Sequence, residues 1–254
     1  MSNAKFKLVR KLAQKKYREE FGLFVAEGMR LCEMALNCAE IEFCFYTENF
    51  LKSARQLELI ARLEKISSTE KISAEDFQKI CDTETPQGIL IVVRQKISSP
   101  QDVAKKSFIA VLDGVGDPGN AGTILRTAEA FDCGIIFLDG ATDIFNPKVV
   151  RASMGAVFHA AVAKMSRENF LSWANSNAFD ITAAVLDDSA EKYFSHDFTK
   201  KTAVVFGSEA AGVSQKIFDA AKKIFIPMRG TAESLNVATA AGIIISEAAR
   251  QLDR

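Results

Sequence analysis

The sequence predicts an α/β fold built on a mostly parallel sheet with helices on both faces. Apolar, strand-like runs alternate with helix-like segments along the chain, and this order of elements is typical of parallel sheets. A short polar stretch, Ile97-Ser98-Ser99-Pro100-Gln101, has the composition of a linker. We therefore expect two units, a small α/β unit over residues 4–96 and a larger α/β unit over residues 97–254.

In the first unit, helical periodicity and turn residues define the expected elements. Leu57, Ile60 and Leu63 are spaced to share one face of a helix, and Ser73 is placed to cap the next helix. The expected helices cover residues 5–17, 29–36, 50–63 and 73–80, and the expected strands cover residues 22–26, 41–46 and 88–93.

In the second unit, strands and helices alternate more regularly. Asn146-Pro147 marks the start of one helix, because proline is favoured at the first helical position, and Ser214 is placed to cap another. The expected strands cover residues 108–112, 135–138, 157–162, 181–186, 203–206 and 223–228, and the expected helices cover residues 121–131, 146–154, 167–175 and 214–221.

The last helix has an unusual composition. Glu233 and Ser234 stand where it should begin, since serine is a good N-cap and an acid suits the positive end of the helix dipole. Thr239 is the one polar residue over 237–245, so we expect a helix that is buried nearly all round. Small residues recur on one side of it every four positions, at Ala238, Gly242 and Ser246.

The overall composition is ordinary for a globular protein, with 48% apolar and 25% charged residues and a net charge of zero. No apolar run reaches the length of a membrane helix, and the N-terminus lacks a signal-peptide pattern. We therefore expect a cytoplasmic protein without a membrane partner. The five cysteines form no Cys-x-x-Cys pair, which favours free thiols and predicts no metal site.

The positive charge is concentrated at the N-terminus. Seven lysines and arginines precede the first acid, Glu19. Such a segment can contact phosphates, and the alternative is a solvated helix face. The segment contains Lys5, Lys7, Arg10, Lys11, Lys15, Lys16 and Arg18.

The loop after the first strand of the second unit permits two interpretations. Gly114, Gly116 and Gly119 satisfy the G-x-G-x-x-G fingerprint of dinucleotide-binding proteins, and Asp139 follows at the end of the next strand. Pro118 argues against this interpretation, because it removes one backbone donor that a pyrophosphate would need. In the other interpretation, Asn120 is the N-cap of the following helix.

Arg126 lies on that helix, opposite its apolar stripe. At about 100° per residue it points roughly 170° from the centre of the stripe, which contains Ile124, Leu125, Ala128 and Phe131. Arg126 is either a solvent-exposed arginine or a cation that serves a site beside the loop. Two more glycine-rich or small-residue loops follow apolar strands, at 207–214 and 226–236, and ligands of open α/β sheets bind at such strand ends.

Together the three loops resemble the three motifs of the SpoU/TrmH family of RNA 2′-O-ribose methyltransferases, in the SPOUT superfamily. The order and spacing agree over residues 107–252, and the segment 146–156 is also similar to that family. Residues 4–96 resemble the family's substrate-binding domain, which is like ribosomal protein L30e. The motifs read Asn120-x-Gly122-x-x-x-Arg126-Thr127-Ala128, Gly207-Ser208-Glu209-x-x-Gly212, and Ile226-Pro227-Met228 with Ser234-Leu235-Asn236-Val237-Ala238.

The resemblance implies an S-adenosyl-L-methionine-dependent enzyme that methylates a ribose 2′-hydroxyl in ribosomal or transfer RNA. It also implies a deep trefoil knot in the second unit and a homodimer. By motif position, the cofactor-binding residues would be Gly207, Ile226, Met228 and Leu235. The catalytic group would be Arg126, Asn120, Glu209, Ser234 and Asn236. We assign RNA contacts to Lys11, Lys15, Lys16 and Arg151.

Within that group, we expect Arg126 to hold the target phosphate and to stabilise the developing alkoxide, since a guanidinium rarely gives up its proton. The general base is left open, and we interpret His159 and His196 as structural. Two alternatives remain at this point. One is an NAD-dependent oxidoreductase that uses the Gly114/Gly116/Gly119 loop, and the other is a non-catalytic RNA-binding module.

Overall fold

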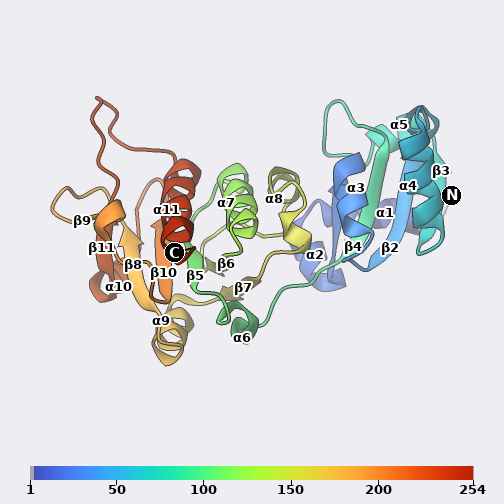
Figure 1. Ribbon diagram of the computed structural model, residues 1–254. Helices are drawn as coiled ribbons and strands as arrows, with labels where there is room; N and C mark the ends of the chain where they lie inside the picture. The colour runs from blue at the N-terminus through green and yellow to red at the C-terminus, as the bar shows by residue number, and fades with distance from the viewer. Residues whose placement is uncertain (1–2, 254) are drawn as a thin grey trace. The chain divides into compact units, whose positions relative to one another are not determined.

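The computed structural model describes residues 3–253, which form two units, each with its own sheet (Figure 1). The first unit contains the residues up to Lys96 together with Phe145–His159, and the second contains Ile97–Ile144 and the residues from Ala160 on. The segment 145–159 thus groups with the first unit rather than with the second. It does so because Phe145 and Phe158 pack on Phe24, with ring centroids 4.8 and 6.0 Å apart.

The first unit is a four-stranded mixed sheet with helices around it. Its strand order is β1-β4-β2-β3, with β4 antiparallel to both of its neighbours and β2 parallel to β3. The strands are β1 (Leu23–Glu27), β2 (Ile41–Thr47), β3 (Ser68–Ile72) and β4 (Ile89–Arg94). The helices are α1 (Asn3–Leu12), α2 (Lys15–Phe21), α3 (Met29–Ala35), η1 (Glu48–Phe50), α4 (Ala54–Glu64), α5 (Ala74–Gln78), α8 (Pro147–Ala152) and η2 (Ala156–Phe158).

The second unit is a seven-stranded sheet in the order β7-β6-β5-β10-β8-β11-β9, and each neighbouring pair in it is parallel. The α/β prediction is therefore confirmed. The strands are β5 (Phe108–Asp113), β6 (Gly134–Leu138), β7 (Val162–Met165), β8 (Asp180–Ala184), β9 (Glu191–Lys192), β10 (Thr202–Gly207) and β11 (Lys222–Phe225). The helices are α6 (Pro100–Val103), α7 (Pro118–Ala130), α9 (Arg167–Ser176), η3 (Tyr193–Ser195), α10 (Gln215–Ala220) and α11 (Val237–Leu252).

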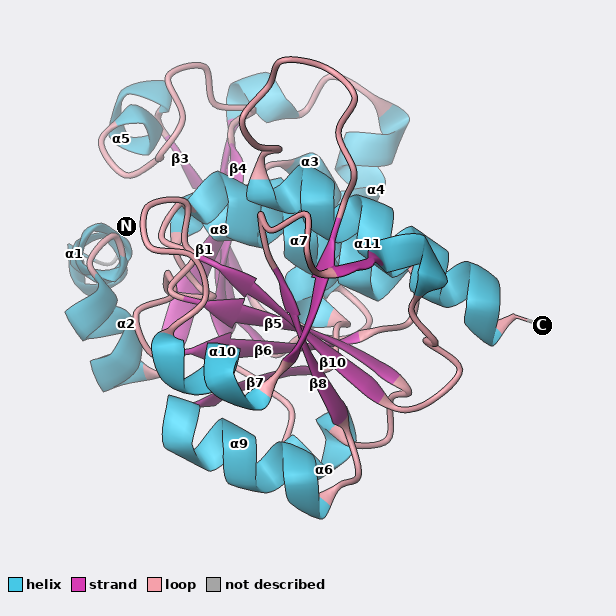
Figure 2. Ribbon diagram, turned by 90° about the vertical axis from the view of Figure 1, so that its left-hand side faces the viewer, coloured by secondary structure: helices cyan, strands magenta, loops and turns pink. Residues whose placement is uncertain are grey.

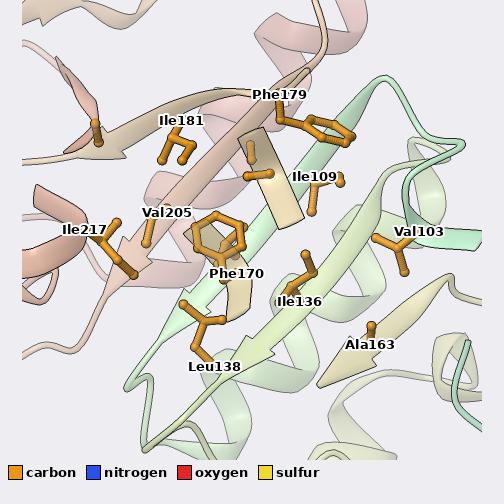
Figure 3. Packing of buried hydrophobic residues seen from close by; sticks show 14 of the residues in the cluster. Val103, Ile109, Ile136, Leu138, Ala163, Phe170, Phe179, Ile181, Val205 and Ile217 are labelled. Carbon is orange, nitrogen blue, oxygen red and sulfur yellow. The ribbon is translucent and has the colours of Figure 1, made fainter. Parts of the chain in front are cut away.

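Helices cover both faces of this sheet. Helices α7 and α11 lie side by side over one face, and α6, α9 and α10 lie over the other (Figure 2). On the second face, Phe170 of α9 and Ile217 of α10 pack among strand residues such as Val205 (Figure 3). Because both faces are buried, the central strands consist almost entirely of apolar residues.

Several elements differ from the sequence-based expectations. The helix expected over 5–17 is two helices, because the chain turns at Ala13–Gln14. The strand expected over 157–162 is wrong: residues 156–158 form a short 3-10 helix in the first unit, and the strand begins only at Val162. Strands β3 and β9 were not expected, since their sequences, STEKI and EK, carry little apolar pattern.

Two helix starts were also misplaced. Helix α7 begins at Pro118, and its N-cap is Asp117, whose side chain accepts a hydrogen bond from the backbone N–H of Asn120 at 2.8 Å. Helix α11 is capped by Asn236 rather than by Ser234. Nor is α11 buried all round, because Thr239 and Ser246 are exposed. Because Asp117 caps α7, the side chain of Asn120 is available for other contacts.

The turn between α1 and α2 depends on a buried cation. Arg18 is 2% exposed, and its Nη1 donates to the backbone oxygens of Leu12 and Ala13, both at 2.8 Å. These two oxygens belong to the end of α1, where carbonyls lack helical partners. Arg18 is therefore a structural residue of the basic segment and is not available to phosphates.

We predict that Arg18→Met lowers the free energy of unfolding by about 2 to 4 kcal/mol, because two charge-assisted hydrogen bonds are lost, one to a buried and one to a partly buried carbonyl. Arg10→Met is the control, since Arg10 is exposed and should change stability by no more than about 0.5 kcal/mol. Denaturant unfolding of both variants measures this difference. Equal stability of the two variants would contradict the role given to Arg18.

Candidate functional site

The three motif loops begin at or near one edge of the larger sheet. Strands β5 and β10 are neighbours in the middle of the sheet, with Gly207 paired to Asp113 at their carboxyl ends. Strands β6 and β7 lie on one side of this pair, and strands β8, β11 and β9 lie on the other. Ligands of open α/β sheets bind in the crevice where the strand order reverses in this way. From β11 the chain crosses back to α11, which packs against α7, β10 and β5. The third motif lies on this return (Figure 1).

One amide joins the three motifs. Asn120 donates from Nδ2 to Glu209 Oε1 at 2.6 Å, and its Oδ1 accepts from Asn236 Nδ2 at 2.9 Å. Asn120 lies in the first turn of α7, Glu209 follows β10, and Asn236 precedes α11. The structure therefore brings together three of the five residues that the sequence assigns to the catalytic group.

Asn236 connects this chain of hydrogen bonds to a helix. Its Oδ1 accepts from the backbone N–H groups of Ala238 at 2.9 Å and Thr239 at 3.3 Å, which are free donors in the first turn of α11. Every amide orientation is thereby determined, since a carboxylate only accepts and a backbone N–H only donates. Ser234, the fourth predicted residue, is exposed and lines the adjacent cavity.

The second motif is a closed loop. The backbones of Ser208 and Gly212 exchange two hydrogen bonds, at 3.1 and 2.9 Å, and Ser208 Oγ accepts from the N–H of Ala211 at 3.1 Å. A Cβ on Gly207 would lie 2.0 Å from the Gly212 carbonyl carbon and 2.2 Å from the Val213 nitrogen. Glycine at 207 is thus required by the neighbouring backbone.

Beside these loops lies a cavity of about 590 Å³, a volume in the range of small-molecule sites. Gly207, Ile226, Met228 and Leu235, the four residues assigned to the cofactor, all contribute to its wall. The rest of the wall comes from the ends of β8 and β10, the closed loop at 208–212 and the start of α11. Most of the residues of the wall are therefore apolar or glycine.

Two carboxylates also line this cavity. Glu209 uses one oxygen to accept from Asn120. Asp187 accepts from the hydroxyl of Ser189 at 2.7 Å and from its N–H at 2.9 Å, and these two hydrogen bonds lower the pKa of the Asp187 carboxyl. The Asp187 carboxyl therefore stays ionised near neutral pH. Sequence reasoning did not identify Asp187, which follows β8 in a segment that the pattern left irregular.

Arg126 is exposed on α7, opposite the residues that the helix buries, as its helical position predicted. Within residues 3–253 its side chain makes no hydrogen bond or ion pair. By contrast, most other arginines of the described chain are paired with a carboxylate or a carbonyl, as Arg55 and Arg167 are. Arg126 is thus a cation that is free to bind an anionic ligand.

A buried carboxylate behind the site was missed by sequence reasoning. Asp113 is 2% exposed and accepts from Arg167 Nε at 2.6 Å and from the Ser214 N–H at 2.7 Å. The N–H of Arg167 in turn donates to Asp139 at 3.3 Å. These contacts connect the ends of β5 and β6 to the starts of α9 and α10.

The same arginine argues against a dinucleotide in the first loop. A Cβ on Gly114 or Gly140 would lie 3.7 or 3.6 Å from Arg167 Nη2. The guanidinium therefore occupies the space beside Gly114, and Asp139 is already engaged with the backbone of Arg167. The sequence fingerprint is present, but the guanidinium of Arg167 lies beside two glycines of this region, Gly114 and Gly140.

Three of the residues assigned to RNA lie on α1 and α2, where Lys11, Lys15 and Lys16 are exposed. Lys15 has an ion pair with Glu19 at 3.7 Å. Arg151 is half-buried and pairs with Asp82 in the first unit. Arg151 is therefore less free to bind a phosphate than the lysines.

The first unit has a hollow of its own, about 1120 Å³ in volume. Arg30 and Lys52 line it, are exposed and have no ion pair within the described residues, whereas Arg55 is held by Glu33 through two hydrogen bonds of 2.7 Å. Amide side chains complete the wall, at Asn49, Gln56, Gln78 and Gln87. This hollow was missed because its cations are far apart in the sequence.

The described residues contain no group of three or more histidines, cysteines or acids that could hold a metal ion. All five cysteines are free thiols. Burial raises the pKa of Cys133 to about 12, so its thiol stays protonated and unreactive at neutral pH. In the described part of the chain, no helix is both long and apolar enough to span a membrane.

Comparison with family models gives two matches. Residues 107–246 match the model of the SpoU rRNA Methylase family, and residues 3–91 match the model of an MRM3-like substrate binding domain. The first match contains all three motif loops. The second covers the four-stranded unit up to the middle of β4.

Individual relatives span almost the whole chain. The 23S rRNA (guanosine(2553)-2′-O)-methyltransferase RlmP of Bacillus subtilis is 31% identical over 96% of this chain and 95% of that protein. The 23S rRNA (uridine(2479)-2′-O)-methyltransferase of Streptomyces viridochromogenes is 31% identical over 94% of this chain and 87% of its own length. The AdoMet-bound rRNA methyltransferase from Sinorhizobium meliloti has a TM-score of 0.88 and 31% identity, covering 99% of this chain and 96% of that one.

We predict that Gly207→Ala lowers the free energy of unfolding by at least about 2 kcal/mol, because the new methyl group overlaps the Gly212–Val213 backbone and opens the loop. Gly230→Ala is the matched control, since a Cβ at that position would have no atom within 4 Å. It should change stability by about 0.5 kcal/mol or less. Chemical denaturation of both variants checks this, and a neutral Gly207→Ala would contradict the closed loop.

Proposed function

This chain belongs to the SpoU rRNA methylase family, and we propose that it transfers the methyl group of S-adenosyl-L-methionine to a ribose 2′-hydroxyl of ribosomal RNA. One observation carries the proposal: Asn120 joins the three motif loops at the edge of a cavity of suitable size. Relatives of similar length act on 23S rRNA, which supports ribosomal RNA as the substrate.

The residues of the cavity fit S-adenosyl-L-methionine. Ile226, Met228 and Leu235 offer apolar surface for the uncharged part of the molecule, and the backbone around Gly207 offers hydrogen-bonding groups. Asp187 and Glu209 provide negative charge for a ligand that carries a sulfonium and an amino group. When bound, this cofactor supplies a methyl group activated by the positive sulfur.

The catalytic roles follow from the contacts. We assign Arg126 to the phosphate next to the target ribose and to the oxygen that becomes negative as the hydroxyl loses its proton. A guanidinium remains protonated, so Arg126 stabilises charge and does not act as the base. The hydrogen bonds among Asn120, Glu209 and Asn236 hold the first turn of α7 in a fixed position relative to the other two loops. Ser234, exposed on the cavity wall, is assigned to contact with the nucleotide.

We assign substrate binding to the first unit, which matches an MRM3-like substrate binding domain. Its exposed positive charge comes from the lysines of α1 and α2, of which Lys15 is paired with Glu19, and from Arg30 and Lys52 in the hollow. Because phosphate contacts dominate RNA affinity, these cations should determine its dependence on salt.

We further propose that the protein is a homodimer located in the cytoplasm. We also propose that its second unit contains a deep trefoil knot. Leu186 and Met228 line the cavity yet are 72% and 37% exposed, so a second copy that covers them would enclose the cofactor. Gly242 adds an open, small surface on α11 for such a contact. Sedimentation equilibrium with and without the cofactor tests the dimer.

The alternatives have less support. The oxidoreductase would need the space beside Gly114 that Arg167 occupies. A non-catalytic RNA-binding module would not need a network that joins all three loops beside a cavity of small-molecule size.

We predict that Arg126→Ala lowers the methyl-transfer rate by about a hundredfold or more, which is the size of loss that removal of an electrostatic stabiliser causes. The affinity for S-adenosyl-L-methionine should change less than about threefold. The cavity wall does not contain Arg126. Glu129→Ala, another exposed position of α7, is the control and should retain activity. Calorimetry and single-turnover rates measure the two effects. A tenfold or greater loss of cofactor affinity would refute this division of roles.

We also predict that reversing the charge of Lys11, Lys15 and Lys16 weakens RNA binding and leaves cofactor binding unchanged. Each lost phosphate contact should lower the slope of log K against log salt by roughly 0.7 to 0.9. Charge reversal is preferable to deletion of residues 1–96, because the segment 145–159 packs on Phe24 and would lose its support.

The control for that experiment reverses Lys65, Lys192 and Lys200, which are equally exposed and change the net charge by the same amount. Binding of an rRNA fragment is titrated at several salt concentrations. If both triple variants show the same slope, the basic segment is only a solvated helix face.

A further inference from the structure

In helix α2 a charged side chain is buried and the aromatic side chains are at least partly exposed, which is the reverse of ordinary burial. Its sequence is KKYREEF, and the one residue that it buries is Arg18. Its two aromatic residues lie outward, with Tyr17 partly exposed and Phe21 37% exposed. In α1, by contrast, the apolar residues Val9 and Leu12 are buried in the core of the first unit. A buried arginine and an exposed aromatic pair are the informative exceptions to ordinary burial.

The two rings are nearly parallel and stacked. Tyr17 and Phe21 are one helical turn apart, their planes differ by 14°, and their centroids are 6.2 Å apart. Ring planes in contact are separated by only about 3.5 to 4 Å. Rings 6.2 Å apart are therefore offset, so that much of each ring face is left uncovered by the other.

Lysines surround this aromatic surface. Lys11 Nζ lies 5.2 Å from the Tyr17 centroid and 5.8 Å from the Phe21 centroid, and Lys16 Nζ lies 5.7 Å from that of Tyr17. An exposed cation–π contact is weaker than the stacking of a nucleic-acid base on an aromatic ring. A base can therefore replace the Lys11 ammonium on the rings, while the displaced lysine pairs with the flanking phosphate. Glu19 and Glu20 are the acids of the same helix, and Glu19 is paired with Lys15.

We propose that Tyr17, Phe21, Lys11 and Lys16 form a stacking platform for an unpaired base of the RNA substrate. Aromatic rings interleaved with lysines are the combination that single-stranded nucleic acid requires, because rings stack on bases and lysines neutralise phosphates. A continuous duplex hides its base faces and would use the lysines alone. The platform therefore selects a loop, bulge or single-stranded segment. This inference rests on the proposed function only in taking RNA as the substrate.

The test compares full-length variants on two RNA probes, a single-stranded oligonucleotide and the same sequence in a duplex. Phe21→Ala should weaken binding of the single strand by roughly 5- to 100-fold, the range found for one lost base–aromatic stack. Binding of the duplex should change less than twofold. The salt slope should stay the same for both probes, because no charge is removed.

Further variants separate the loss of stacking from a loss of helix stability. Phe21→Leu keeps an apolar side chain but cannot stack, so it should lose single-strand affinity as Phe21→Ala does. Phe21→Trp should retain it. Trp173 is the one tryptophan of the chain, so Phe21→Trp combined with Trp173→Phe should show fluorescence quenching by the single strand and none by the duplex. Glu20→Ala is the neighbouring control.

Wild-type single-strand affinity in Phe21→Leu and Phe21→Ala, or equal losses on both probes, would overturn the platform. Self-association of the protein that disappears in Phe21→Ala would identify the aromatic pair as a protein contact and would also overturn it. Methyl transfer by the wild-type protein is measured separately on ribosomal RNA. Its absence would contradict the proposed function and leave the binding comparison valid.

Discussion

The site depends on the fixed orientation of one side-chain amide. Glu209 can only accept a hydrogen bond, so the amide group of Asn120 that faces it must be the NH₂. Asn120 Oδ1 then faces Asn236, whose own oxygen is held by two N–H groups of α11. In this chain of hydrogen bonds, from the Glu209 carboxylate to the start of α11, every donor and every acceptor is determined. Three loops that are separated by up to 116 positions in the chain share this one arrangement.

The fold and the membership of the site were predictable to different degrees. The apolar strands of the larger sheet could be found because both of their faces are buried, as with Phe108–Asp113. Strand β3 could not, since Ser68–Ile72 is a largely polar strand at the end of its sheet. The strand expected over 157–162 failed because the apolar residues there, such as Val157, are buried in the other unit. No local pattern says which of two cores an apolar residue joins.

The same limit applies to the site. Asn120 and Asn236 were found through a family resemblance, but Asn120 was taken for a helix cap, a role that belongs to Asp117. The misplaced cap of α7 is informative here, because Asn120 does not cap its helix and makes long-range contacts instead. Asp113 and Arg167 were missed because a buried ion pair between residues 54 positions apart leaves no periodic signal. Their pairing places a guanidinium beside Gly114, the first glycine of the dinucleotide fingerprint.

The grouping of Phe145–His159 with the first unit has a mechanical consequence. The backbone passes from one unit to the other at Lys96–Ile97, at Ile144–Phe145 and at Ala160, three crossings in place of a single tether. The two units are therefore joined by three stretches of backbone. Cleavage of the chain at any one crossing would still leave the units covalently joined through another.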